Sequence, residues 1–213
     1  MGGIATLKKK DPQMIDQEQP LKILTEGQYQ LSFKYKFEAG HRLTKATAGT
    51  CMTPHGHTWY AEATFGSSAQ FLDGQDMALE FTVLKKAWRI FIHETADHTY
   101  FHHYQDALLS SIREHVPCFR GLPFPGDPTT ELIAALFFSK INVMNMDLQA
   151  RLTNEGRQLP VPSPVMVAIQ ETPTNRVTLT AGPALESFLE KINAHFSGWW
   201  QVADPLARDL VAK

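Results

Sequence analysis

Two segments in the first third of the chain alternate between apolar and polar residues. Residues 28–41 place an apolar side chain at nearly every second position, and His41 extends that row. Residues 56–66 repeat the alternation. Because successive side chains of a strand point to opposite faces, both segments are predicted to be strands with one buried face. If they pair as an antiparallel hairpin, the end of the first strand lies beside the start of the second.

Helical spacing replaces this alternation after Glu80. Apolar residues then recur at intervals of three and four positions, at Phe81, Leu84, Trp88, Phe91 and Ile92. This pattern predicts an amphipathic helix that ends near Thr95. A second helix is expected to begin with Asp127 as its N-cap and Pro128 as its first residue. Its continuous apolar run over 132–138 indicates that most of its circumference is covered.

Alternation returns in the last third of the chain. It predicts a strand over 165–171 and a shorter one over 177–180, before an amphipathic segment over 183–196. Two stretches, 105–126 and 149–164, follow neither period, and we expect long loops that act as lids or contain a short element. Strands in hairpins with helices grouped between them are typical of the α+β class with an antiparallel sheet.

The composition is that of an ordinary globular domain. The chain has 213 residues, of which 43% are hydrophobic and 20% charged, and its net charge is -2. This length suits a single domain over 28–213, preceded by a polar arm over 1–27. Lysines cluster only at 8–10, so we expect neither nucleic acid nor a membrane surface as a partner.

The sequence also shows no pattern typical of a targeting signal or a membrane span. No apolar stretch approaches the roughly 20 residues that span a bilayer, and the first 20 residues do not resemble a secretory signal. The two cysteines, Cys51 and Cys118, do not make a disulfide framework. We therefore expect a cytoplasmic protein with reduced thiols.

A cluster of histidines carries the strongest chemical signal. His55 and His57 point to the same side of the second strand, and the hairpin would bring His41 beside them. Three neutral imidazoles leave one position of a tetrahedral Zn²⁺ open, as in catalytic sites. The alternative is that these are ordinary core or surface histidines. Cys51 could be a fourth ligand of a structural site, or a thiolate that acts as a base beside the metal.

Two further features carry candidate chemistry. Asp97 and His98 follow the first helix, where the imidazole could pair with the carboxylate or simply interact with the helix dipole. Glu171 continues the apolar face of the strand over 165–171, so it should project into apolar surroundings and needs a partner. That partner could be an Arg or Lys of the fold, or a ligand with adjacent N–H donors such as a 2-amino-4-oxo pyrimidine edge.

Five short motifs follow one another between about residues 28 and 182. They are Phe37-Glu38-Ala39-Gly40-His41-Arg42-Leu43, Cys51-x-x-x-His55-Gly56-His57, Asp97-His98, Pro128-Thr129-Thr130-Glu131 and Gln170-Glu171-Thr172. Their order and composition resemble the 6-pyruvoyltetrahydropterin synthase / 6-carboxytetrahydropterin synthase family. The resemblance implies a tunnelling fold: a four-stranded antiparallel sheet with two helices on one face. It also implies assembly into an oligomeric barrel, a hexamer or tetramer, with active sites at subunit interfaces.

The resemblance implies a zinc-dependent lyase that acts on a small pterin, 7,8-dihydroneopterin triphosphate. The zinc ligands would be His41, His55 and His57. The groups that move protons would be Cys51, Asp97 and His98. The residues that hold the pterin ring would be Thr129, Thr130, Glu131 and Glu171. Lys36, Arg42 and Lys45 are candidates for the triphosphate by proximity alone.

The spacing of Cys51 and His55 resembles the 6-carboxytetrahydropterin synthase branch, which makes a precursor of queuosine. In that branch acetaldehyde and triphosphate are both lost, whereas in the 6-pyruvoyltetrahydropterin synthase branch only triphosphate leaves. A third alternative is a non-catalytic member that binds metal or pterin. Relative to a compact member of the family, 105–126 and 149–164 are insertions.

Overall fold

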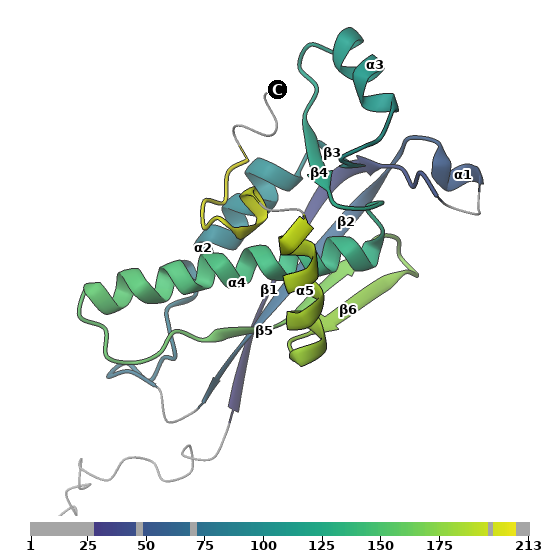
Figure 1. Ribbon diagram of the computed structural model, residues 1–213. Helices are drawn as coiled ribbons and strands as arrows, with labels where there is room; N and C mark the ends of the chain where they lie inside the picture. Colours follow the sequence, from purple (N-terminus) through teal and green to yellow (C-terminus); the bar gives the residue numbers. More distant parts are fainter. Residues whose placement is uncertain (1–27, 46–48, 69–71, 196–197, 208–213) are drawn as a thin grey trace, which may run out of the picture.

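The predicted hairpin forms the centre of the sheet. In the computed structural model, which describes residues 28–45, 49–68, 72–195 and 198–207 (Figure 1), strands β1 (Gln28–His41) and β2 (His55–Ser68) pair antiparallel along their whole length. Both strands were predicted from alternation alone, with bounds within two residues. The predicted N-terminal arm lies outside the described residues.

Four further strands extend the sheet on both sides of the hairpin. They are β3 (Thr99–His103), β4 (Gly121–Phe124), β5 (Ser163–Gln170) and β6 (Arg176–Thr180). The order is β4-β3-β1-β2-β5-β6, in which β2, β5 and β6 are antiparallel neighbours whereas β3 and β4 are parallel to β1. The four antiparallel strands are therefore confirmed, and the expected number of strands was too small by the two short parallel ones.

Two helices cover one face of this sheet, which confirms the α+β class (Figure 1). Helix α2 (Phe81–Ile90) continues as the π-helical turn η3 (Phe91–Ala96), and α4 (Thr130–Asn154) packs against β5 and β6. The remaining helical segments are α1 (Gly49–Met52), α3 (Leu108–His115), α5 (Pro183–His195) and the 3₁₀ turn η4 (Trp199–Gln201).

The core lies between the inner face of the hairpin and these helices. Alternate residues of β1 and β2 point into it, and the apolar stripe of α2 meets them, as the two periodicities predicted. Its largest fully buried aromatic side chains are Phe37, Trp59, Phe65, Trp88, Phe91, Phe101, Phe124, Phe137 and Trp200. Phe91 and Phe137 meet edge to face with centroids 4.7 Å apart, which joins η3 to α4.

The predicted start of α4 was wrong by two residues. Its N-cap is Thr129, whose hydroxyl accepts a hydrogen bond from Leu132 N–H over 3.3 Å. Asp127 is not available as a cap because its carboxylate accepts from the Thr44 hydroxyl (2.6 Å) and from Lys45 N–H (2.8 Å). A contact with a distant loop has thus replaced the local one.

Both predicted loops contain more regular structure than expected. The stretch 105–126 holds α3 and β4, which is the short-element alternative. The stretch 149–164 is mostly helix at its beginning, since α4 continues to Asn154, and β5 begins at Ser163. The sequence did not predict the regular structure in either stretch, because neither has a clear hydrophobic period.

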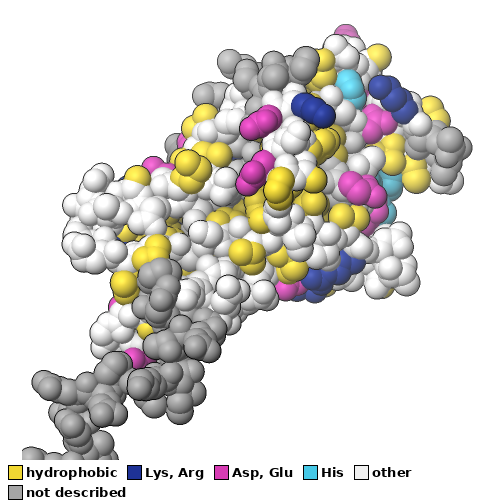
Figure 2. Space-filling model, turned by 60° about the horizontal axis from the view of Figure 1, so that its bottom comes forward, with side chains coloured by type: hydrophobic (Ala, Val, Ile, Leu, Met, Phe, Trp, Pro, Cys, Tyr) yellow, Lys and Arg dark blue, Asp and Glu magenta, His cyan; other side chains and the backbone are white. Residues whose placement is uncertain are grey.

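The surface in Figure 2 carries acidic and basic side chains scattered among apolar ones. This mixture agrees with the small net charge of -2. In the ranges that the structure describes, helices long and apolar enough to cross a membrane are absent.

A buried lysine fastens the C-terminal segment to α4. Lys140 is 0% exposed, and its ammonium donates to the carbonyls of Trp199 (2.8 Å) and Val202 (2.6 Å). The same nitrogen lies 3.5 Å from the centroid of the Trp199 ring, in cation–π geometry. Burial lowers the pKa of Lys140 to about 7. Two carbonyls and one aromatic ring stabilise the charged ammonium, but they offset only part of the free-energy cost of removing it from water.

This lysine should make stability depend on pH. Between about pH 7 and 10 the unfolded chain binds a proton that folded Lys140 has lost, so unfolding becomes less favourable as the pH rises. We expect wild type to gain up to about 3 kcal/mol over Lys140→Met between pH 7 and 9.5, at about 1.4 kcal/mol per pH unit. Urea unfolding at both pH values measures this. The control is Lys86→Met, which replaces an exposed lysine on α2. If the stability of wild type and of Lys140→Met changed with pH in parallel, the expectation would be contradicted.

Candidate active site

The three histidines gather where β1 ends and β2 begins. The register pairs His41 with His55 and Ala39 with His57, so the three rings share the inner face. Their centroids are 4.6 Å (His41–His55), 5.2 Å (His41–His57) and 4.9 Å (His55–His57) apart. One nitrogen of each ring lies within 4.8 Å of the other two. The hairpin thus brings the imidazoles together, as the strand pattern predicted.

Backbone carbonyls orient two of these rings. His41 Nδ1 donates to the Pro128 carbonyl over 2.9 Å, and His55 Nδ1 donates to the Thr53 carbonyl over 2.7 Å. Each bond leaves Nε2 with its lone pair, which is the usual arrangement of a metal-binding imidazole. His41 Nε2 and His57 Nε2 are buried without a hydrogen-bond partner.

This donor set fits a divalent metal ion. Burial is the main cause that lowers the pKa of His57, which favours the neutral imidazole that ligates metals. Trp59 closes the inner side of the cluster, with its ring centroid 5.1 Å from His41 and 5.3 Å from His57. Three imidazoles would leave one position of a tetrahedral ion for a further ligand.

Glu171 completes this cluster from the end of β5. Its Oε1 lies 3.3 Å from His41 Nε2 and 3.4 Å from His57 Nε2, while Oε2 accepts from the Thr130 hydroxyl over 2.9 Å. The His41 ring is the main cause that lowers the pKa of Glu171. The expectation of apolar surroundings was therefore wrong: the neighbours of this carboxylate are two imidazoles and a hydroxyl.

The other two predicted pterin residues lie apart from the triad. Thr129 caps α4, and Glu131 is exposed. Both border a cavity of about 580 Å³ between α4, β6 and α5, lined chiefly by apolar groups such as Leu179 and Phe188. Among the predicted pterin residues, the structure joins Thr130 and Glu171 to the histidines and places Thr129 and Glu131 at a neighbouring cavity.

Cys51 lies in the loop between the two strands of the hairpin, on the single turn of α1. Its carbonyl accepts from Leu43 N–H over 2.9 Å, which closes the loop beside His41 and His55. The cluster of ligand atoms in the described part of the chain consists of the three imidazoles and does not include the Cys51 sulfur. The candidate ligand atoms in this cluster are therefore three imidazole nitrogens, without the thiol.

Asp97 and His98 lie at the start of β3, and they contact each other. His98 Nδ1 is 2.9 Å from Asp97 Oδ2, and Asp97 Oδ1 accepts from Glu38 N–H over 2.7 Å. Burial opposes the shift, but the hydrogen bonds from Glu38 and His98 lower the pKa of Asp97. His98 adopts a left-handed φ of 53°, rare for residues other than glycine, and its N–H donates to the Glu38 carbonyl over 2.7 Å.

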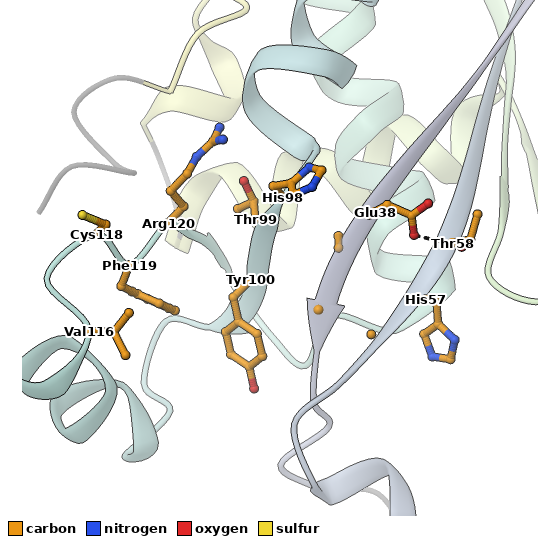
Figure 3. A pocket seen from close by; sticks show the side chains of 13 residues that line it. Glu38, His57, Thr58, His98, Thr99, Tyr100, Val116, Cys118, Phe119 and Arg120 are labelled. Carbon is orange, nitrogen blue, oxygen red and sulfur yellow. Dashed lines mark hydrogen bonds between the residues drawn. The ribbon is translucent and has the colours of Figure 1, made fainter.

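Backbone hydrogen bonds fix this pair to Glu38, whose own side chain lies on the face of β1 opposite to His41. Glu38 and Gly40 alternate with Ala39 and His41 along β1, so they occupy the outer face of the hairpin. His98 borders a cavity of about 570 Å³, and His57 of the triad lines the same cavity. Figure 3 shows Tyr100 and Phe119 on other parts of its wall. Within one copy, the described residues show no hydrogen bond between His98 and the triad.

Two of the three cations near the site already have an acidic partner. Lys36 Nζ lies 3.0 Å from Glu38 Oε1, and Arg42 forms a two-pronged pair with Asp106. Lys45 contributes its backbone N–H to Asp127. Sequence reasoning could not find Asp106, because it lies 64 residues from Arg42 in a stretch without a hydrophobic period.

Comparison with known proteins decides the family. Residues 30–181 match the sequence profile described as 6-pyruvoyl tetrahydropterin synthase, which is more than two thirds of the chain. The chain belongs to this family. Its tunnelling fold is shared by the solved members that it resembles, and the predicted family is confirmed.

Two curated relatives are named 6-carboxy-5,6,7,8-tetrahydropterin synthase. The Aquifex aeolicus protein is 27% identical over 165 residues, covering 70% of this chain and 95% of the relative. The Bacillus subtilis protein is 26% identical over 157 residues, covering 72% and 88%.

Solved structures support the fold. An uncharacterized protein from Wolinella succinogenes is similar with a TM-score of 0.54 at 18% identity, covering 74% of this chain and all of that one. The 6-pyruvoyl tetrahydropterin synthase of Plasmodium vivax is similar with a TM-score of 0.51 at 14% identity, covering 74% and 99%. These likenesses show the tunnelling fold, whose sheet and two covering helices the chain shares.

Proposed function

We propose that this protein is a zinc-dependent 6-carboxy-5,6,7,8-tetrahydropterin synthase that acts in the cytoplasm. It converts 7,8-dihydroneopterin triphosphate and one water to 6-carboxytetrahydropterin, acetaldehyde and triphosphate. The observation that supports this most directly is the open triad of His41, His55 and His57 with Glu171 beside it. The names of the two curated relatives and the short spacing between Cys51 and His55 favour the carboxy product.

The residues around the triad have separable roles in this proposal. Zn²⁺ on the triad supplies a Lewis acid that acidifies the side-chain hydroxyls of the substrate. Glu171 accepts hydrogen bonds from the 2-amino group and N3–H of the pterin, and Thr130 orients the carboxylate by donating to Oε2. Cys51, as the thiolate, removes a proton from the substrate side chain.

Asp97 and His98 relay a second proton, and in the proposal they serve the site of a neighbouring copy. They are already paired with each other, and the described residues show no hydrogen bond between this pair and the triad of the same copy. An oligomer that places this pair against the triad of the next subunit would complete both sites. The precursor of queuosine would be the product of such an assembly.

Product analysis tests the reaction. Purified protein incubated with 7,8-dihydroneopterin triphosphate should release acetaldehyde and triphosphate in equal amounts. Triphosphate with 6-pyruvoyltetrahydropterin and no acetaldehyde would instead establish the pyruvoyl reaction that the family description names. Binding of metal and pterin without any product would support the non-catalytic alternative.

Cys51→Ala should lose at least about 100-fold in kcat, since a positioned base contributes about 10²–10⁴-fold. About one zinc per chain should remain, because the sulfur is not in the ligand cluster. Steady-state kinetics and metal analysis measure both. Retained turnover would contradict the role of Cys51 as the base.

Mixed oligomers provide the control for that variant. Cys51→Ala and His98→Ala should each be inactive alone, whereas an equal random mixture should regain about one quarter of wild-type activity if each site combines residues of two copies. No recovery on mixing would place both groups in the same subunit or remove His98 from the mechanism.

A further inference from the structure

One arginine ties the 105–126 segment to the metal-binding end of the hairpin. Arg42 Nε donates to Asp106 Oδ2 over 2.7 Å, and Arg42 Nη2 pairs with Asp106 Oδ1. The Asp106 side chain is 1% exposed. Its Oδ1 also accepts from Leu108 N–H over 2.9 Å, at the first turn of α3. This buried carboxylate therefore joins α3 to the residue that directly follows His41.

The same arginine reaches the loop that carries Cys51. The carbonyls of residues 51–53 accept in turn from Leu43 N–H, Arg42 Nη1 and His55 Nδ1, over 2.9, 3.3 and 2.7 Å. Three successive carbonyl groups of the loop are thus held by donors that flank or belong to the triad. Of these donors, only the guanidinium of Arg42 is itself held by a residue outside the hairpin.

The chemistry of this link requires arginine. A guanidinium has five N–H groups in one rigid plane, so two edges can serve two partners at fixed angles. Here Nε and Nη2 face the carboxylate, which leaves Nη1 for the Met52 carbonyl. An ammonium on a flexible stem could satisfy one of these partners but would not orient the other.

We propose that Arg42 and Asp106 are positioning residues, which hold the Cys51 loop in register with the metal centre and use the 105–126 segment as the anchor. This inference rests on the proposed function only for its effect on turnover, since the thiolate of Cys51 is the group whose placement it controls. A displacement of about 1 Å at a reacting group can cost on the order of 10²-fold in rate.

The test combines Asp106→Asn with a direct measurement of the Cys51 thiol. In a Cys118→Ser background, Cys51 is the one cysteine of the chain, so its alkylation by iodoacetamide reports on the loop. Relative to that background, Asp106→Asn should accelerate alkylation at least about 5-fold and lower kcat about 10-fold or more. KM should stay within about 2-fold, and the zinc content should not change.

A matched control removes an equivalent pair elsewhere. Asp147→Asn breaks the exposed Asp147–Arg151 pair on α4, whose Nε–Oδ2 distance is 2.9 Å, and should alter neither alkylation nor kcat. If Asp106→Asn resembles this control in both measurements, the pair has no positioning role and the proposal is overturned. A parallel loss of zinc would overturn it as well, because the defect would then lie in the metal centre.

A second variant covers the case in which Asp106→Asn does not fold. Arg42→Lys keeps the cation beside Asp106 but loses the planar fork, and it should give the same faster alkylation and lower kcat. Unchanged values in a folded Arg42→Lys protein would overturn the proposal. If the background protein itself turns over no pterin, the proposed function fails, whereas the alkylation rates still decide whether the pair holds the loop.

Discussion

Replacing His57 by alanine is expected to remove both the metal and the activity. His57 contributes one of three nitrogens that lie within 4.8 Å of one another, and its Nε2 is buried without a hydrogen-bond partner. Two imidazoles alone would hold Zn²⁺ weakly. The Lewis acid is worth several kcal/mol in the transition state, so kcat/KM should fall at least about 10³-fold. Metal analysis after dialysis and steady-state kinetics measure the two losses.

A different histidine provides the control for this prediction. His115 is exposed on α3, where its Nδ1 donates to the Ser111 carbonyl over 2.9 Å. His115→Ala should keep about one zinc per chain and full turnover. Treatment of wild type with a chelator should reproduce the His57→Ala defect, and added Zn²⁺ should reverse it only in wild type. A His57→Ala protein that retains stoichiometric zinc would show that the triad is not the metal site.

The hairpin and its triad were predictable because their signal is local. A period of two runs through both strands and puts the histidines on the buried row of each strand, so antiparallel pairing of the buried faces brings His41 beside His55. The second helix was equally visible, since its apolar run is unbroken. Its first turn was not, because Asp127 is occupied by Thr44 and Lys45 from a loop more than 80 residues earlier.

Other parts of the site depend on contacts that no local pattern reveals. The strands β3 and β4 have 5 and 4 residues, too few to show a period. In the folded chain β3 pairs with β1, and β4 pairs with β3. For that reason the sequence could not tell where Asp97 and His98 would lie relative to the triad. The partners of Arg42 and Glu171 are hidden in the same way, since each lies far along the chain.

Glu171→Gln is expected to raise KM at least about 100-fold while leaving the zinc in place. Gln has the same shape, but it presents an N–H₂ where the carboxylate accepts from the two N–H donors of the pterin edge. Two charge-assisted hydrogen bonds of about 1.5–3 kcal/mol each account for this loss. Substrate titration with metal analysis of the same samples measures both quantities.

The control for this prediction is a carboxylate that the structure places outside the cluster. Glu131 is exposed beside the neighbouring cavity, so Glu131→Gln should raise KM less than about 10-fold.

The position of Glu171 makes the metal measurement decisive. Its Oε1 lies 3.3 and 3.4 Å from the two imidazole nitrogens that would bind zinc, so it could also serve as the fourth ligand. If Glu171→Gln loses its zinc, this carboxylate belongs to the metal shell, and the pterin must be held by other groups.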